Sequence, residues 1–274
     1  MEEIIKKAEN GDIEAQEELG KYYYQNPKER DLTKSFYWFL KAGENGSKEA
    51  QYNLGFFYET GQGTDKNIEK AIEWYKKSAK QGFQKAQYNL GCIYARGIDV
   101  EQDWKESTRW FERAGGNGHV KSQRMAGIAY ATGKGVKQNQ EQAFRYFKKS
   151  AEGNDTEAQF YLAVCYDTGQ GTDKNIEEAV NWYKKSAENG NSEAQICLAE
   201  CLLKGEGIAK DEKEAFFWMS KSAEQFNPDA LYYMGTFYLE GVAGEKNIEK
   251  AKDMLKKSAE LGNKEAEEIL EKIY

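Results

Sequence analysis

Apolar residues recur along this chain at a spacing that is typical of paired α-helices. A small residue opens each block, a leucine follows four residues later and a tyrosine four residues after that, as in Ala50, Leu54 and Tyr58. Because a spacing of four keeps side chains on one face of a helix, each block predicts an amphipathic helix. The opening residue stands at positions 15, 50, 86, 122, 158, 194, 230 and 266, so the repeat is 35 residues once and then 36.

A second helix is predicted in the other half of each repeat. It follows an Asp or Asn, whose side chain can accept hydrogen bonds from the unpaired N–H groups of the first turn. Seven residues further stands a large apolar residue, for example Trp38, Trp74 or Trp182, and another follows it at once. The capping positions are Asp31, Asn67, Asp103, Asn139, Asn175, Asp211 and Asn247. Each repeat is therefore expected to be an antiparallel pair of helices.

Glycine recurs at two kinds of position. One lies inside the first helix, as at Gly20 and Gly235, where glycine costs about 1 kcal/mol and so indicates the close approach of a neighbouring helix. The other follows the first helix, as at Gly61 and Gly169, where a left-handed residue can close the last turn. Two loops depart from this pattern: Gln-Asn-Pro replaces the glycine loop in the first repeat, and the third repeat lacks the second loop glycine.

Neither helix of such a pair can bury its apolar stripe alone, so the pairs are expected to stack. The predicted fold is all-α, an α-α superhelix in the form of a right-handed solenoid with seven helix-turn-helix repeats over residues 12–263. A partial repeat at 2–11 and a polar capping helix at 264–274 complete a single domain over 1–274. The repeats are predicted to start near residues 12, 47, 83, 119, 155, 191 and 227.

The order of these signals resembles a known family. The pattern A-x-x-x-L-G-x-x-Y, then G-x-G, then N/D-x-x-K/E-A-x-x-W-Y-x-K-S-A is similar to Sel1-like repeats, α-solenoid relatives of tetratricopeptide repeats, over roughly residues 8–274. The resemblance implies a non-enzymatic scaffold or adaptor that binds proteins. It leaves two alternatives: an immunity or antitoxin protein that binds a toxin, and a protein that binds or hydrolyses β-lactams or peptidoglycan-related compounds.

The second alternative belongs to a secreted, cysteine-rich branch of the family, in which disulfides link the two helices of a repeat. Here all four cysteines fall in predicted first helices, so that pattern is absent. Their registers also carry apolar residues in other repeats, which favours small buried side chains over a thiolate metal site. The cysteines are Cys92, Cys165, Cys197 and Cys201.

The resemblance to tetratricopeptide arrays places the first helices along a concave groove. Positions two and six residues after the opening small residue would then face a peptide or partner protein. In several repeats these positions carry aromatic residues, and one carries arginine, a composition that is typical of binding hot spots. The predicted groove residues are Tyr52, Phe56, Tyr88, Arg124, Phe160, Ile196 and Tyr232. Packing between adjacent repeats is the alternative role for the tyrosines.

A second contact surface is predicted on the second helices. Tyr37 and Phe217 occupy a register at which other repeats have polar residues, and they could serve the convex side or the contact between protomers of a homo-oligomer.

Composition narrows the function classes further. A net charge of −7 argues against nonspecific nucleic-acid binding, which needs a basic surface. The single histidine, His119, stands at a helix start and gives little support to a catalytic triad or an imidazole metal site. No cofactor, metal or catalytic residue is predicted, and no stretch approaches the roughly 18 apolar residues of a membrane span. We expect a cytoplasmic protein, or a secreted or periplasmic one if a signal peptide has been removed.

Overall fold

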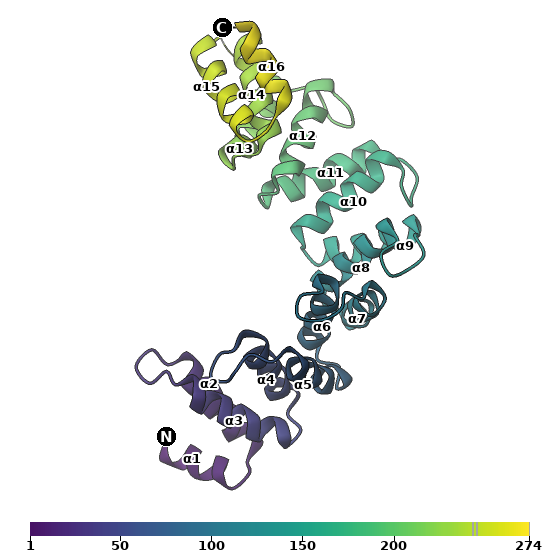
Figure 1. Cartoon of the computed structure of the whole chain (residues 1–274). Helices are drawn as coiled ribbons and strands as arrows, with labels where there is room; N and C mark the ends of the chain where they lie inside the picture. The colour runs from purple at the N-terminus through teal and green to yellow at the C-terminus, as the bar shows by residue number, and fades with distance from the viewer. Residues whose placement is uncertain (243, 245, 274) are drawn as a thin grey trace. The chain divides into compact units, whose positions relative to one another are not determined.

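The computed structural model of the chain describes residues 1–242, 244 and 246–273 (Figure 1). These residues form sixteen α-helices and contain no β-strand, so the predicted all-α class is confirmed. The contacts divide the chain into two compact units, unit 1 with residues 1–138 and unit 2 with residues 139–274. Tyr274, the last residue of the predicted capping segment, lies outside the described residues.

The described residues of each unit form eight helices. Those of unit 1 are α1 (Glu2–Glu9), α2 (Ile13–Gln25), α3 (Leu32–Glu44), α4 (Lys48–Thr60), α5 (Ile68–Lys80), α6 (Gln84–Arg96), α7 (Trp104–Gly116) and α8 (Val120–Thr132). Those of unit 2 are α9 (Gln140–Glu152), α10 (Thr156–Thr168), α11 (Ile176–Glu188), α12 (Ser192–Lys204), α13 (Glu212–Glu224), α14 (Pro228–Glu240), α15 (Ile248–Glu260) and α16 (Lys264–Ile273).

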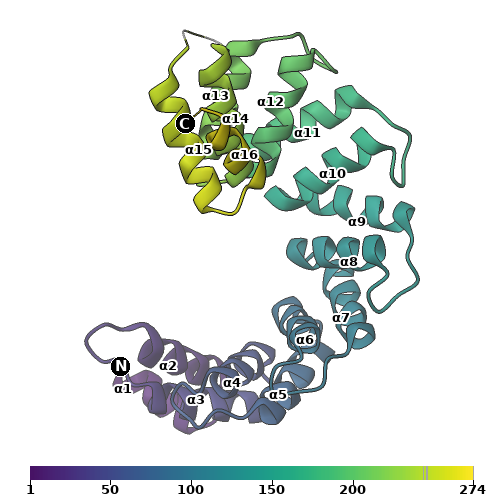
Figure 2. The same ribbon diagram turned by 45° about the horizontal axis from the view of Figure 1, so that its top comes forward.

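Packing follows the order of the chain. Within each unit every helix packs against the next one, and α4 also touches α6, a succession that Figures 1 and 2 show in two views. The leucine of the first helix and the residue after the tryptophan fill the interior, as with Leu54 and Tyr75, both 0% exposed. Consecutive helix pairs thus form a solenoid within each unit, as predicted, while the handedness of the superhelix stays a prediction.

The predicted helix ends are confirmed. Each capping Asp or Asn of a second helix accepts a backbone N–H of the first turn, for example Lys70 N to Asn67 Oδ1 at 2.8 Å. The glycines that close first helices are all left-handed: Gly61, Gly97, Gly133, Gly169, Gly205 and Gly241. Local sequence therefore fixes where most of these helices begin and end.

The glycines inside first helices allow the close approach that the sequence predicted. A Cβ atom on Gly20 would lie 2.7 Å from Cε1 of Phe39, and one on Gly235 would lie 2.6 Å from Cγ of Leu255. In both cases the obstructing side chain belongs to the second helix of the same repeat. Glycine lowers the helix propensity of the first helix, but it lets the two helices of the repeat pack more closely.

A ladder of buried polar side chains ties the helices together. Gln51 Nε2 donates to the carbonyl oxygen of Gly43 at 3.0 Å, and Gln51 Oε1 accepts from Gln81 Nε2 at 2.9 Å, so one side chain on α4 links the ends of α3 and α5. Ser78 Oγ adds a bond to the Lys48 carbonyl oxygen at 2.6 Å. The buried glutamines at this register are Gln16, Gln51, Gln87, Gln123, Gln159 and Gln195. Satisfied buried groups of this kind fix the register between neighbouring helices.

The loop of the third repeat keeps the common backbone form without its second glycine. Asp99 occupies the register that Gly63 holds in the preceding loop, and it adopts a left-handed φ of 63°. Its carboxylate accepts from Lys66 Nζ at 2.6 Å.

Candidate functional site

Tyr52 of unit 1 combines packing between repeats with an exposed edge. It projects from α4, and its ring centroid lies 5.8 Å from that of Tyr75 on α5 and 5.2 Å from that of Phe83, which precedes α6. The side chain is half-buried. Tyr52 can therefore pack between adjacent repeats and still offer part of its ring to a partner, the two roles that the sequence left open.

Tyr88 has the equivalent environment one repeat later. Its ring centroid lies 5.9 Å from Phe111 on α7 and 5.0 Å from His119, and the side chain is half-buried. Burial is the main cause that raises the pKa of Tyr88 to about 12, against the opposing charges of Arg124 and Arg96. The phenol is therefore neutral at physiological pH, and the positive charges of Arg124 and Arg96 partly offset the effect of burial on its pKa.

Phe83 departs from the capping pattern. It stands at the N-cap of α6 and makes no side-chain hydrogen bond there. Six other first helices have a capping side chain that accepts a backbone N–H: Asp12, Ser47, His119, Asp155, Asn191 and Asn227. Loss of such a cap costs about 1 kcal/mol. In place of the cap, α6 begins with an aromatic ring that packs on Tyr52.

Two adjoining pockets open beside Tyr52. The first has a volume of about 480 Å³ and is lined by Lys21, Lys48, Glu49, Tyr52, Asn53, Gly82, Phe83, Gln84 and Lys85. The second has a volume of about 310 Å³ and is lined by Lys21, Tyr24, Gln25, Phe39, Tyr52, Asn53, Phe56 and Phe57. Since both are lined by Lys21, Tyr52 and Asn53, they lie side by side. We call them the lysine pocket and the aromatic pocket.

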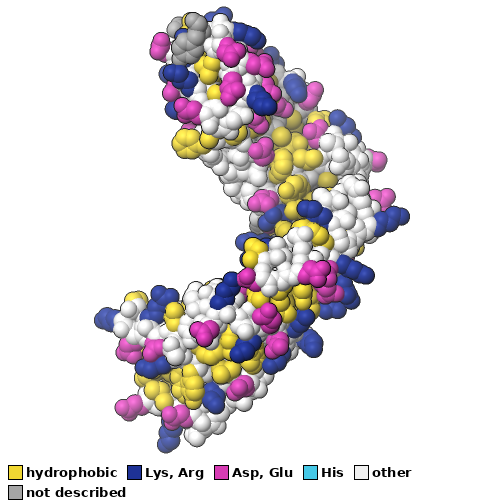
Figure 3. Space-filling model, in the orientation of Figure 1, with side chains coloured by type: hydrophobic (Ala, Val, Ile, Leu, Met, Phe, Trp, Pro, Cys, Tyr) yellow, Lys and Arg dark blue, Asp and Glu magenta, His cyan; other side chains and the backbone are white. Residues whose placement is uncertain are grey.

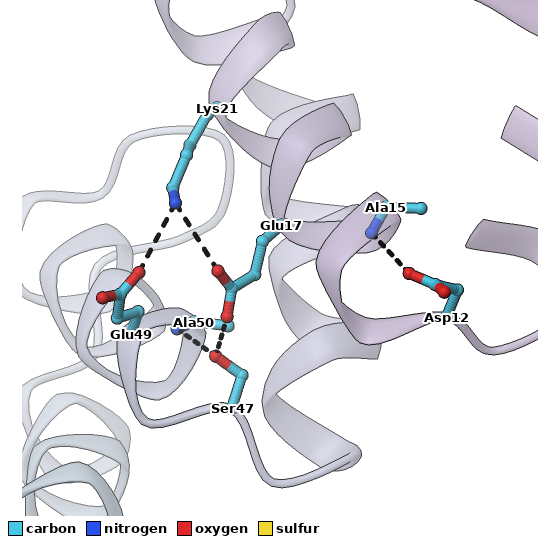
Figure 4. A network of polar contacts seen from close by, with 7 residues as sticks. All are labelled: Asp12, Ala15, Glu17, Lys21, Ser47, Glu49 and Ala50. Carbon is cyan, nitrogen blue, oxygen red and sulfur yellow. Dashed lines mark hydrogen bonds and ion pairs between the residues drawn. The ribbon is translucent and has the colours of Figure 1, made fainter. Parts of the chain in front are cut away.

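A polar network fixes one wall of these pockets. Figure 4 shows Lys21 of α2 between two carboxylates, with Nζ 3.5 Å from Glu17 Oε2 and 3.4 Å from Glu49 Oε2 on α4. Ser47 Oγ donates to Glu17 and accepts from the backbone N–H of Ala50 at 3.0 Å. The ammonium group of Lys21 is thus held across the junction between α2 and α4.

Unit 2 carries the remaining groove candidates on its own first helices. Phe160 on α10 is half-buried, with its ring centroid 6.1 Å from that of Tyr183 on α11. Tyr232 on α14 is also half-buried, and its ring centroid lies 5.4 Å from that of Tyr233. Ile196 on α12 is only 7% exposed and packs in the core of unit 2, so it offers little surface to a partner.

The other two candidates of unit 1 lie at the same face of their helices. Phe56 of α4 lines the aromatic pocket, and Arg124 of α8 is half-buried. Nothing in the structure tests whether any groove candidate contacts a partner, so those assignments stay predictions.

The predicted second surface consists of exposed aromatic side chains. Tyr37 on α3 is 49% exposed and Phe217 on α13 is 48% exposed. Each ring packs edge-on against the tryptophan that follows it, Tyr37 on Trp38 at 5.0 Å and Phe217 on Trp218 at 5.1 Å between centroids. These rings are exposed at the surface, and neither of them lines the lysine pocket or the aromatic pocket.

His119 caps a helix, and Cys165 and Cys201 are buried thiols. His119 caps α8, with Nδ1 accepting from Ser122 N at 3.3 Å, and its pKa is lowered first by burial and then by Lys121 and Lys85. Burial raises the pKa of the Cys165 and Cys201 thiols to about 11, so neither is a thiolate at physiological pH. The described part of the chain holds no group of three His, Cys, Asp or Glu side chains that could bind a metal ion.

The surface carries charges of both signs. On the face that Figure 3 shows, Lys and Arg side chains alternate with Asp and Glu over both units, and apolar side chains reach the surface between them. None of the described helices is both long and apolar enough to span a bilayer.

Stacked pairs of short helices, joined by a buried polar ladder, define a helical repeat protein of the α-solenoid class. The sequence model of the Sel1 repeat family matches seven segments, residues 13–47, 48–83, 84–119, 120–155, 156–191, 192–225 and 228–263. The chain therefore belongs to the Sel1 repeat family, as the resemblance predicted. Proteins with Sel1 repeats are in general scaffolds for protein interactions and are mostly not enzymes.

Two solved structures are similar over nearly the whole chain. One is a protective antigen present in uropathogenic Escherichia coli strains that displays an SLR fold, with 36% identity and a TM-score of 0.92 over 98% of this chain and 58% of that one. The other is a Sel1 repeat protein from Oxalobacter formigenes, with 27% identity and a TM-score of 0.80 over 99% of this chain and 79% of that one. This chain thus spans less than two thirds of the length of the antigen. No curated protein matches it.

Of the nine residues that line the lysine pocket, one, Tyr52, was predicted from the sequence as a groove residue. Phe83 precedes α6, and Gln84 and Lys85 open it, whereas groove residues were predicted only at positions two and six after the opening small residue. One signal could have found them: an aromatic residue stands where other repeats have a polar cap. A broken local rule of this kind often marks a functional position.

Proposed function

We propose that this chain is a non-enzymatic scaffold that binds a peptide or a partner protein through the first helices of its repeats. The partner would contact the groove residues Tyr52, Phe56, Tyr88, Arg124, Phe160 and Tyr232. The observation that carries the proposal is the pair of adjoining pockets around the half-buried ring of Tyr52. Ligand sites in proteins are typically concave, largely apolar and equipped with a few polar groups.

Hot-spot energies set the affinity that we expect for a peptide ligand. Aromatic hot-spot residues contribute about 2 kcal/mol each, and ordering a flexible peptide offsets part of that gain. Three rings contribute about 6 kcal/mol before that cost, which corresponds to a dissociation constant of roughly 40 μM or weaker for a short peptide. A folded partner that covers several repeats would bind more tightly.

Affinity capture from the native cell followed by mass spectrometry tests the proposal. A variant with Tyr52→Ala, Tyr88→Ala and Phe160→Ala should lose the partners that the parent chain captures, with its helical circular dichroism retained. The matched control is Tyr37→Ala with Phe217→Ala, which removes two exposed rings from second helices and should keep those partners. Capture that survives in the triple variant would refute the assignment of the groove residues.

Location and partner identity follow from this proposal only in part. We propose a cytoplasmic location, which fractionation of the native cell would test. A toxin as the partner, and action on β-lactams or peptidoglycan-related compounds, stay predictions of the family resemblance. A homo-oligomer formed through Tyr37 and Phe217 also stays a prediction, which sedimentation would test.

A further inference from the structure

The two pockets beside Tyr52 differ in chemistry. Three lysines and one glutamate contribute to the lysine pocket, although the chain as a whole carries a net charge of −7. The aromatic pocket is lined by Tyr24, Phe39, Phe56 and Phe57 in addition to the shared residues. A cationic site therefore lies directly beside an apolar one on an otherwise acidic protein.

Two of the three lysines form no ion pair with another described residue. Lys21 forms ion pairs with Glu17 and Glu49. Over the part of the chain that the structure describes, neither Lys48 nor Lys85 has an ion-pair partner. The charge of Lys85 also reaches the neighbouring repeat, where it is one of the causes that lower the pKa of His119. The lysine pocket is thus complementary to a negative charge.

The last repeat of the chain supplies an internal comparison. A pocket of about 300 Å³ there is lined by residues 180 positions further on, including Asp229, Asn263 and Glu265 at the registers of Glu49, Phe83 and Lys85. Asn263 Oδ1 accepts from Ala266 N at 2.9 Å and Nδ2 donates to Asp229 at 3.0 Å, so the cap is intact. The same repeat geometry therefore accommodates a capped pocket with two carboxylates and one lysine, Lys264.

Phe83 and Lys85 are two of the residues at which the lysine pocket differs from the pocket of the last repeat. Phe83 gives up the cap of α6 and places a ring against Tyr52, and Lys85 reverses the charge that Glu265 has at the same register. Both changes fall in one pocket and favour the same kind of ligand, one with an anionic and an apolar part.

We infer that the paired pockets bind an acidic segment of a protein partner, with a carboxylate in the lysine pocket and an adjacent large aromatic or aliphatic side chain in the aromatic pocket. Because Tyr52 and Asn53 line both pockets, the two groups belong to neighbouring residues of the ligand. The carboxylate is that of an Asp or Glu side chain or of a chain end. This inference rests on the proposed function and specifies its ligand.

The inference is tested by selecting peptides that bind the full chain from a random library. The library displays each peptide both within a longer sequence and at a free C-terminus. We expect the selected peptides to have Asp, Glu or a terminal carboxylate beside Phe, Tyr, Trp, Leu or Ile. Amidated copies of the selected peptides distinguish a terminal carboxylate from a side chain. A selection without acidic groups, or without any binder, would overturn the inference.

Two substitutions taken from the chain's own repeats sharpen the test. Lys85→Glu and Phe83→Asn install the residues found at positions 265 and 263, so the fold should tolerate them. Each should weaken binding of the selected peptides, measured by fluorescence anisotropy, by about tenfold or more. The matched control is Lys80→Glu, which makes the same charge change at an exposed position outside both pockets, where other repeats have Glu152, Glu188, Glu224 and Glu260.

The outcomes separate this inference from the proposed function. Peptide binding that is equally sensitive to Lys80→Glu and Lys85→Glu would show a diffuse charge effect and refute the paired site. If Phe83→Asn and Lys85→Glu instead dissociate an oligomer in sedimentation, the occupant is a second copy of this chain and the inference fails. A further outcome is that the triple variant at Tyr52, Tyr88 and Phe160 loses partner capture while Lys85→Glu keeps it. That result would support the proposed function and refute the paired-pocket inference.

Discussion

The loop glycine at Gly207 gives a sharp test of how one repeat rests on the next. Gly207 has a left-handed φ of 69°, and a Cβ atom there would lie 2.8 Å from the carbonyl oxygen of Ile176 at the start of α11. Gly205 closes α12 with a similar φ of 72°, but its nearest obstruction is Lys210 Cβ at 3.5 Å, an ordinary contact. The two positions differ in what they touch and hardly at all in backbone conformation.

Substituting alanine for each glycine separates the cost of a left-handed backbone from the cost of steric overlap with the preceding repeat. Gly205→Ala should destabilise by about 1 kcal/mol, the cost of a left-handed conformation for a residue with a Cβ atom. Gly207→Ala adds overpacking against backbone, which costs roughly 1–3 kcal/mol more. The total for Gly207→Ala is then about 2–4 kcal/mol.

Hydrogen exchange followed by mass spectrometry is the suitable assay, because contacts in a repeat array are local and so is their loss. We expect faster exchange in the first turn of α11 for Gly207→Ala than for Gly205→Ala. Equal protection of that turn in the two variants would show that the loop does not rest on the preceding repeat as described.

Two further substitutions probe the polar ladder and a buried phenol. Gln195→Leu removes the bond to the Ala187 carbonyl oxygen, 3.0 Å in the parent chain, and should cost about 1–3 kcal/mol in thermal unfolding; a change within experimental error would mean that the ladder does not hold the helices. Burial raises the pKa of Tyr88 from 10.0 to about 12, so its contribution to stability is complete below pH 10 and is lost as the pH rises to about 12. Urea midpoints should therefore fall less steeply over that range for Tyr88→Phe, and identical slopes would contradict the burial of this phenol.

The helices were predictable because their signals are local. The capping side chain of Asn67 bonds an N–H three residues away, and Gly61 closes the helix that it directly follows. The apolar spacing of Leu54 and Tyr58 needs only the geometry of one helix. Each of these signals is complete within a few residues of sequence.

The candidate site depends on contacts between repeats, which spacing alone does not contain. Ile196 occupies the same register as Tyr52, yet its shorter side chain stays within the core at 7% exposure whereas the tyrosine ring reaches the surface. Gln51 bonds to two other helices, so its role became visible only when all three were in place. Lys85 became a candidate binding residue only because it lines the lysine pocket, which its neighbours in the sequence do not indicate.

Because the helices pack mainly on their immediate neighbours, the number of repeats in such a chain can change during evolution. Removing or adding one whole repeat would rebuild a single junction and leave the other interiors untouched. Residues 61–79 and 169–187 differ at only three positions, so the coding segments for repeats could be exchanged or duplicated in register. Chain length is thus an adjustable quantity in this architecture, while the chemistry of each pocket can diverge one repeat at a time.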